Sequence, residues 1–211
     1  KKLHRVTVRS VPDDLIDDPA VAIVSRLVVT GGNHHRLHEE LTVSGGYLRD
    51  RSFRREEAVT RVQRWLDVGH PVTAGDGLFD TLRERFDSSH ESILRAVESR
   101  SKERLEFLGN TLRSRKEREV TDIHAVLDEL ETAIRGELQK DEQPEQFSLF
   151  SEDERTQLRR DTAALEARLE RIPTEREQEE RAIEARYAKL DDRTFPVAVI
   201  FLVPESMGGA V

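Results

Sequence analysis

A histidine-rich segment, residues 34–40 with the sequence HHRLHEE, holds the side chains best suited to bind a metal ion. Neutral imidazoles and carboxylates are ligands for zinc or nickel. However, this spacing matches no closed zinc site. A helical i, i+4 pair of the first and third histidines would also need a helix directly after the Gly31-Gly32 turn. We therefore interpret the segment as a solvated loop and predict no metal site.

Motifs that would indicate catalysis are not found. Asp13, Asp14, Asp17 and Asp18 lack the glycine and the distal glutamate of a calcium loop, so we interpret them as a solvated turn. The sequence contains no G-x-x-x-x-G-K-[ST] phosphate loop, no G-x-G-x-x-G and no G-x-S-x-G. We therefore predict no catalytic residue and no cofactor for this chain.

One basic stretch is a candidate for contacts with DNA phosphates, which require a cationic surface. It consists of Arg49, Arg51, Arg54, Arg55, Arg61 and Arg64. Asp50, Glu56 and Glu57 dilute its charge. The alternative is a solvated helix face with i, i+4 ion pairs between these arginines and their acidic neighbours.

A short apolar segment, Gln146-Phe147-Ser-Leu149-Phe150, is the candidate for binding a partner protein. Burial of each large apolar side chain is worth about 1.5–3 kcal/mol, so we expect these residues to dock onto another surface. The segment is similar to the peptides through which bacterial DNA-metabolism proteins bind the sliding clamp. The alternative is docking within the chain, as a hydrophobic staple for the following helix.

Hydrophobic patterns predict a small base domain of strands with one helix. The segments 3–8, 21–30 and 38–43 read as strands, and Gly45-Gly46 is expected to end the third. Residues 54–68 read as a helix. The run 195–204, FPVAVIFLVP, is typical of a fully buried strand, and residues 1–48 must supply the sheet that it enters.

Two long charged helices are predicted over 77–140 and 152–190. Apolar residues from Val120 to Ile134 and from Leu158 to Ile172 step by three and four, as in a heptad seam. Asp76 is expected to cap the first helix, and Ser151 with Glu154 forms a capping box for the second. Because the first helix is longer, we expect it to overhang the second or to break, with Gly109-Asn110 as the favoured position of a break. At Pro173 we expect an interruption or kink, with Thr174 recapping the helix.

These elements together predict an α+β fold with two parts. Residues 1–70 and 193–211 form a mixed α/β base domain, and residues 71–192 form an inserted antiparallel coiled-coil hairpin with its turn at 141–151. A three-helix bundle remains an alternative to the hairpin. The short connection between the helices favours pairing within the chain.

Composition and charge limit the classes of function. Charged residues make up 36% of the 211 residues, well above the roughly 25% of a typical globular domain, which favours elongated helices with much solvated surface. Residues 71–192 carry 21 Lys/Arg against 31 Asp/Glu, a balance of −10 that disfavours unspecific DNA binding. The chain has no cysteine and no spanning apolar run, so we expect a cytoplasmic location and no membrane. It begins without methionine, and we expect a fragment of a longer protein.

Residues 146–204 resemble the C-terminal region of bacterial SNF2-type helicase-like proteins, including those of the DISARM phage-defence system. The resemblance rests on the segment QFSLFSEDERTQL at 146–158, on the charged helix with Leu165, Leu169 and Pro173, and on the terminal run 195–204. It implies a parent protein that is a nucleic-acid-dependent ATPase. It transfers no catalytic residue, because the ATPase motifs are absent from this chain.

Two functions therefore remain open at this point. In the first, the chain is a non-catalytic accessory domain of such a helicase, whose coiled-coil arm contacts DNA, a partner protein or the ATPase core of the parent polypeptide. In the second, it is a coiled-coil interaction or dimerisation module with no link to nucleic acid.

Overall fold

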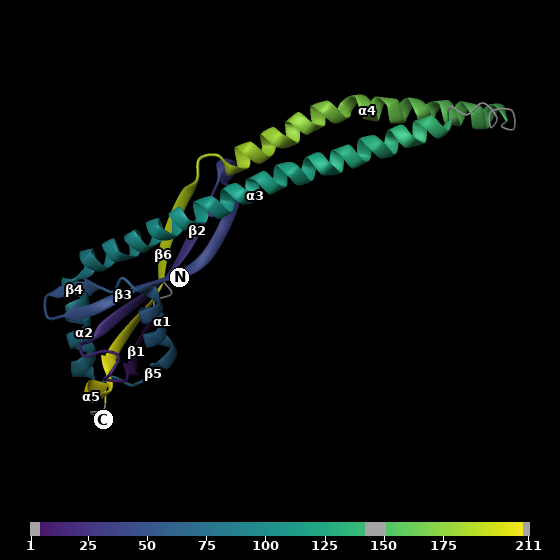
Figure 1. Cartoon of the computed structure of the whole chain (residues 1–211). Helices are drawn as coiled ribbons and strands as arrows, with labels where there is room; N and C mark the ends of the chain where they lie inside the picture. The colour runs from purple at the N-terminus through teal and green to yellow at the C-terminus, as the bar shows by residue number, and fades with distance from the viewer. Residues whose placement is uncertain (1–4, 142–150, 209–211) are drawn as a thin grey trace. The chain divides into compact units, whose positions relative to one another are not determined.

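The computed structural model describes residues 5–141 and 151–208 of the chain, which form a mixed α/β structure (Figure 1). The elements in chain order are β1 (Arg5–Val11), β2 (Ala20–Thr30), the 3-10 turn η1 (Gly32–His34), β3 (Arg36–Arg49), β4 (Ser52–Arg55), α1 (Val59–Val68), β5 (His70–Pro71), α2 (Asp76–Ser88), α3 (His90–Asp141), α4 (Glu152–Tyr187), β6 (Asp191–Pro204) and α5 (Glu205–Gly208).

The strands form one six-stranded mixed sheet in the order β4-β3-β2-β6-β1-β5. The last strand of the sequence, β6, lies between β2 and β1, antiparallel to β2 and parallel to β1. Phe201 is paired with Val21 on one side and with Val8 on the other. The apolar run 195–204 therefore enters a sheet of N-terminal strands, as the sequence predicted.

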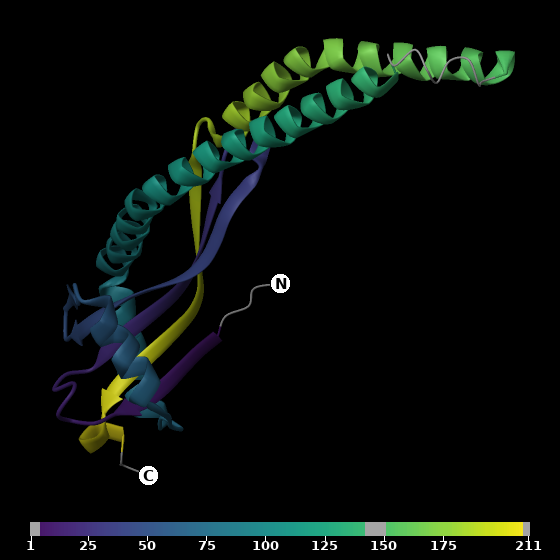
Figure 2. The ribbon, with the colours of Figure 1, turned by 45° about the vertical axis from the view of Figure 1, so that its right-hand side comes forward.

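Side chains of this sheet alternate between two apolar clusters, one on each face. Ala20, Ala22 and Leu202 contact α1 through Val62 and Trp65 on one face. On the opposite face, side chains of the sheet contact α2 and the first turns of α3, in the cluster Val8, Val21, Ile23, Leu48, Leu82, Ile93, Val97, Phe201 and Val203. Helices thus cover both faces of the sheet (Figure 2).

The chain divides into two compact units. Unit 1 contains residues 1–30, 36–109 and 190–211, with the sheet, α1, α2 and the first part of α3. Unit 2 contains residues 31–35 and 110–189, with the rest of α3 and α4. The division falls inside α3, at Gly109-Asn110.

In unit 2, α3 and α4 run side by side in opposite directions (Figure 1). Leu127, Ile134 and Ile172 are buried between them, with partly buried Ile123, Leu130, Leu138, Leu165 and Leu169 packed around them. Ion pairs repeat the antiparallel order, because residue numbers rise on α3 as they fall on α4. Lys116 contacts Glu184 at 3.4 Å, His124 contacts Glu180 at 3.6 Å, and Asp128 contacts Arg176.

Two predicted breaks in the long helices are wrong. Helix α3 is continuous through Gly109, and the helical break lies instead at Ser89, between α2 and α3. Helix α4 continues through Pro173, so Thr174 does not recap it. Ile172, the neighbour of Pro173, is anchored in the apolar contact with α3. The predicted capping box is confirmed, because Ser151 and Glu154 hydrogen-bond reciprocally.

Predictions around β3 and β4 also need correction. Gly45-Gly46 does not end the third strand, since β3 runs on to Arg49 and pairs with β4. A Cβ at Gly46 would lie 2.2 Å from the Arg54 carbonyl oxygen, so glycine allows this close strand pairing. Residues 54 and 55 therefore belong to β4, and the helix begins only at Val59.

Asp76 lies inside α2, whose N-cap is Gly75, so Asp76 is not the cap that the sequence predicted.

Among the described residues, no helix combines the length and apolar character that are needed to cross a membrane.

Candidate interaction surface around strands β3 and β4

The six arginines of the basic stretch form an arginine row that is spread over three elements and one turn of unit 1. Arg49 ends β3, Arg51 lies in the turn to β4, Arg54 and Arg55 belong to β4, and Arg61 and Arg64 belong to α1. A hollow of about 300 Å³ brings four of the six together, namely Arg49, Arg54, Arg55 and Arg61, with Asp17, Tyr47, Glu56 and Glu57. Arg51 and Arg64 do not line it.

Half of the row is neutralised by carboxylates. Arg49 pairs with Asp18 at 3.1 Å, and Arg61 pairs with Glu56 at 3.0 Å. The other Glu56 oxygen accepts a hydrogen bond from the Ala58 backbone N–H at 3.0 Å, so this side chain also stabilises the start of α1. These two arginines therefore have little charge left for an external anion.

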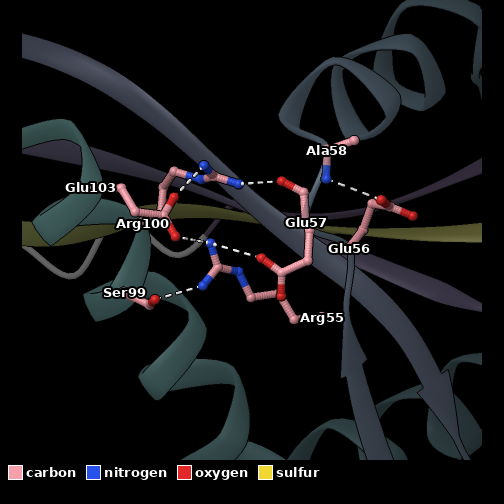
Figure 3. A network of polar contacts seen from close by, with 7 residues as sticks. All are labelled: Arg55, Glu56, Glu57, Ala58, Ser99, Arg100 and Glu103. Carbon is pink, nitrogen blue, oxygen red and sulfur yellow. Dashed lines mark hydrogen bonds and ion pairs between the residues drawn. The ribbon is translucent and has the colours of Figure 1, made fainter. Parts of the chain in front are cut away.

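Arg55 is at the centre of a network that joins β4 to α3 within unit 1 (Figure 3). Its guanidinium donates to Ser99 Oγ and to Glu103 Oε1, both at 2.5 Å. The second Glu103 oxygen accepts a hydrogen bond from Arg100, which also donates to the Glu57 backbone carbonyl at 3.1 Å. Hydrogen bonding from Arg55 lowers the pKa of Glu103. Arg55 therefore has a structural role. Its partners Ser99 and Glu103 are 44 and 48 residues away in the sequence, so no local pattern indicated them.

The remaining three arginines are the free cations of this surface. Arg51, Arg54 and Arg64 are exposed. None of their side chains makes a hydrogen bond or ion pair with another residue in the ranges 5–141 and 151–208. They remain the candidates for binding DNA phosphates.

A second hollow, of about 430 Å³, lies along β3 and was not predicted from the sequence. Its walls come from β3, α1 and the first part of α3, and include Leu41, Thr42, Val59, Gln63, Arg104 and Phe107. Leu41 and Phe107 are 68% and 64% exposed, respectively. The spacing of Arg100, Arg104 and Phe107, by four and three, was the available sign that these side chains share one helix face.

A bidentate ion pair forms part of the wall of this second hollow. Arg104 donates to both carboxylate oxygens of Glu40, at 2.5 and 2.8 Å, and its guanidinium lies 4.8 Å from the centre of the Phe107 ring. Hydrogen bonding from Arg104 lowers the pKa of Glu40. The pair therefore stabilises the ionised form of a carboxylate that is 19% exposed.

Changing Arg104 to glutamine should reduce the free energy of unfolding at pH 7 by about 1 kcal/mol, a modest value because the pair is partly exposed. A lowered folded pKa means that Glu40 contributes stability above its unfolded pKa, about 4.3, and that this contribution is lost as pH falls through the folded pKa. The difference between variant and native chain should therefore shrink in urea titrations below about pH 4. Arg95→Gln, in an exposed 3.9 Å pair, should change stability little at any pH. A pH-independent loss for Arg104→Gln would contradict this assignment.

The other predicted residues are placed as follows. His34 lies in η1, and His38 contacts Glu40 at 3.2 Å. Across residues 5–141 and 151–208, no three histidine, aspartate or glutamate side chains are grouped so as to hold a metal ion. Gln146, Phe147, Leu149 and Phe150 lie outside the described residues.

Comparisons with models of known families, with curated proteins and with solved structures give no match to this chain.

Proposed function

We propose that this chain is a non-catalytic accessory domain of a bacterial SNF2-type helicase-like protein and that it binds DNA or a partner protein for the parent ATPase. The observation that carries the DNA-binding part is the set of three free, exposed arginines, Arg51, Arg54 and Arg64. The residues behind the family resemblance add support. Leu165 and Leu169 pack against α3, and the run 195–204 is part of the central strand β6.

The architecture that we propose for this function is an antiparallel coiled-coil hairpin inserted into an α/β base. The three- and four-residue steps of the buried positions on α3 and α4, and the antiparallel order of their ion pairs, support it. The position of β6 inside the sheet also supports it, because the chain returns to the base after the helices. The hairpin then serves as a contact arm for DNA, a partner protein or the ATPase core.

Salt-dependent binding of a fluorescent DNA duplex tests the role of the free arginines. Each neutralised phosphate contributes a slope of about −0.9 to the plot of log affinity against log salt. The triple change Arg51→Glu, Arg54→Glu and Arg64→Glu should therefore weaken binding at low salt and reduce the slope by about 2 to 3.

The matched control makes the same change of net charge elsewhere. Arg83, Arg95 and Arg181 are about equally exposed and lie in simple i, i+4 pairs, so their triple change to glutamate should affect binding less. Equal losses for the two triple variants would mean that net charge alone decides binding. Absence of binding by the native chain at low salt would exclude a DNA-contacting role.

The second candidate function is a protein-interaction module unrelated to nucleic acid. The −10 balance of residues 71–192 and the exposed apolar side chains of Leu41 and Phe107 favour it. The sequence of the full-length gene product separates the candidates. A phosphate loop and a DExx-type motif upstream support the helicase assignment, and their absence supports the interaction module.

A further inference from the structure

Within the described part of the chain, strand β3 has a free edge over part of its length. On one side, β3 pairs with β2 without a register shift, from His38 opposite Val29 to Tyr47 opposite Ala20. On the other side, it pairs with β4 only over residues 46–49. In an antiparallel strand, alternate residues direct both backbone polar groups to the same side. The Leu48 N–H donates to Pro19 on the β2 side, and the Gly45 carbonyl accepts from Glu56 on the opposite side. The odd-numbered residues from Glu39 to Val43 therefore direct their N–H and C=O groups away from the sheet.

This free edge has a defined beginning and end. At one end, the pairing with β2 shifts between Val29 and Thr30, where β3 skips a residue of the register. At the other end, Glu56 already donates to Gly45 at 2.9 Å. Between them, Glu39, Leu41 and Val43 form an outward-directed set that is symmetric about Leu41.

The space beside this edge is open and partly apolar. The hollow of about 430 Å³ follows it, between side chains of α1 and of the first part of α3. Leu41, at the centre of the free edge, is 68% exposed, the highest value among the large hydrophobic residues in the ranges 5–141 and 151–208. Exposed, unpaired edges of this kind are templates for pairing with another strand.

Carboxylates beside the edge do not repel an incoming strand, because cations of the same chain neutralise them. Glu39 contacts both Arg26 and Arg36 at 2.6 Å. Glu40 contacts Arg104 and His38. The edge thus lacks the unpaired charge by which natural proteins commonly prevent edge-to-edge association.

We propose that two copies of this chain pair through the free edge of β3, antiparallel, about a two-fold axis at Leu41. In this register Leu41 of one copy lies opposite Leu41 of the other. By symmetry, Glu39 of each copy lies opposite Val43 of the other copy. The three pairs exchange about six backbone hydrogen bonds and join the two sheets into one. The inference is independent of the proposed function, since either candidate function is compatible with a dimer.

Charge and symmetry favour a second copy as the occupant. With the axis at Leu41, Glu40 lies opposite the partner's Thr42, so no like charges face each other. With the axis at Glu40, two glutamates would lie directly opposite, which is unfavourable. The edge thus presents a self-complementary sequence in the one register that uses all three outward-directed residues.

Disulfide trapping tests the register, because the native chain has no cysteine. Opposed residues in a hydrogen-bonded antiparallel pair have Cα atoms about 5.5 Å apart, a separation that fits a disulfide. Leu41→Cys should therefore form a covalent dimer on mild oxidation, seen in non-reducing gels and removed by reductant. Leu94→Cys, at an exposed position of α3, is the matched control and should remain monomeric. Equal cross-linking of both variants would overturn the proposal, since it would indicate random collision.

Sedimentation equilibrium of the unmodified chain gives a second, independent readout. The native chain should show a concentration-dependent mass up to that of two chains. Leu41→Lys should raise the dissociation constant of the dimer at least tenfold, because it places two cations opposite each other. Leu94→Lys should leave this dissociation constant unchanged. Circular dichroism checks that each variant is folded. A native mass of one chain at all concentrations, without trapping at position 41, would overturn the proposal.

Discussion

Replacing Trp65 with alanine should destabilise the chain by about 3–5 kcal/mol. Trp65 is fully buried in the cluster between α1 and the sheet, where its ring makes an edge contact with Tyr47 at 5.2 Å. Removal of this side chain leaves a large cavity among Val62 and Leu202, which are held by the helix and by the central strand. Because a typical domain has only about 5–15 kcal/mol of stability, this loss is a large part of the total.

Urea denaturation followed by circular dichroism measures this effect, since the variant lacks the only tryptophan of the chain. Trp65→Phe is the informative control. Trp65 Nε1 has no hydrogen-bond partner among the described residues, so phenylalanine loses ring volume but no hydrogen bond. The reduction in the free energy of unfolding should therefore be clearly smaller for Trp65→Phe than for Trp65→Ala. A Trp65→Ala variant within 1 kcal/mol of the native chain would contradict the packing of α1 on the sheet.

Replacing Ile172 with alanine should cost about 2–5 kcal/mol in the free energy of unfolding. Ile172 is 1% exposed and contacts the buried side chains of Leu127 and Ile134 on α3. It also precedes Pro173, where the helix lacks one backbone donor. The side chain therefore anchors α4 at the point where its own hydrogen bonding is weakest.

Thermal and urea unfolding followed by the helical signal at 222 nm tests this prediction. Val126→Ala, at a 58% exposed position of α3, is the control and should change stability by less than about 0.5 kcal/mol. Fluorescence of Trp65 reports unit 1 in the same samples. If Ile172→Ala and Val126→Ala behaved alike, the antiparallel packing of α3 on α4 would be wrong.

Local patterns in the sequence were sufficient to predict the elements that hydrophobic side chains or short-range hydrogen bonds define. The β-branched run of β2 indicated a buried strand, since only a covered sheet stabilises so many apolar side chains. The apolar run 195–204 indicated the strand β6 correctly, but the prediction that it is fully buried is wrong, because only residues 201–204 are buried and Phe195 is 48% exposed. The capping box at Ser151 and Glu154 was readable because its two hydrogen bonds join residues three apart. The heptad steps likewise predicted Leu165, Leu169 and Ile172 as side chains of α4 that pack against α3.

Patterns that depend on distant partners were not readable. Gly45-Gly46 resembles a turn signal, but at Gly46 the absence of a side chain instead permits close pairing with Arg54. Glycine at position 109 and proline at position 173 suggested breaks, but both helices continue through them. At Pro173 the packing of Ile172 against α3 offsets a local cost of about 3 kcal/mol. A single glycine such as Gly109 costs only about 1 kcal/mol in a helix interior, too little to end a long helix.

The sequence by itself determined a mixed α/β chain with two long charged helices and a basic row at positions 49–64, because composition and periodicity act over neighbouring residues. Only the tertiary structure decided which members of that row are free. Arg55 is neutralised by Glu103, 48 residues away, whereas Arg54 beside it has no such partner among the described residues. The free edge of β3 was also decided at this level, because a strand's second neighbour depends on how the whole sheet is assembled.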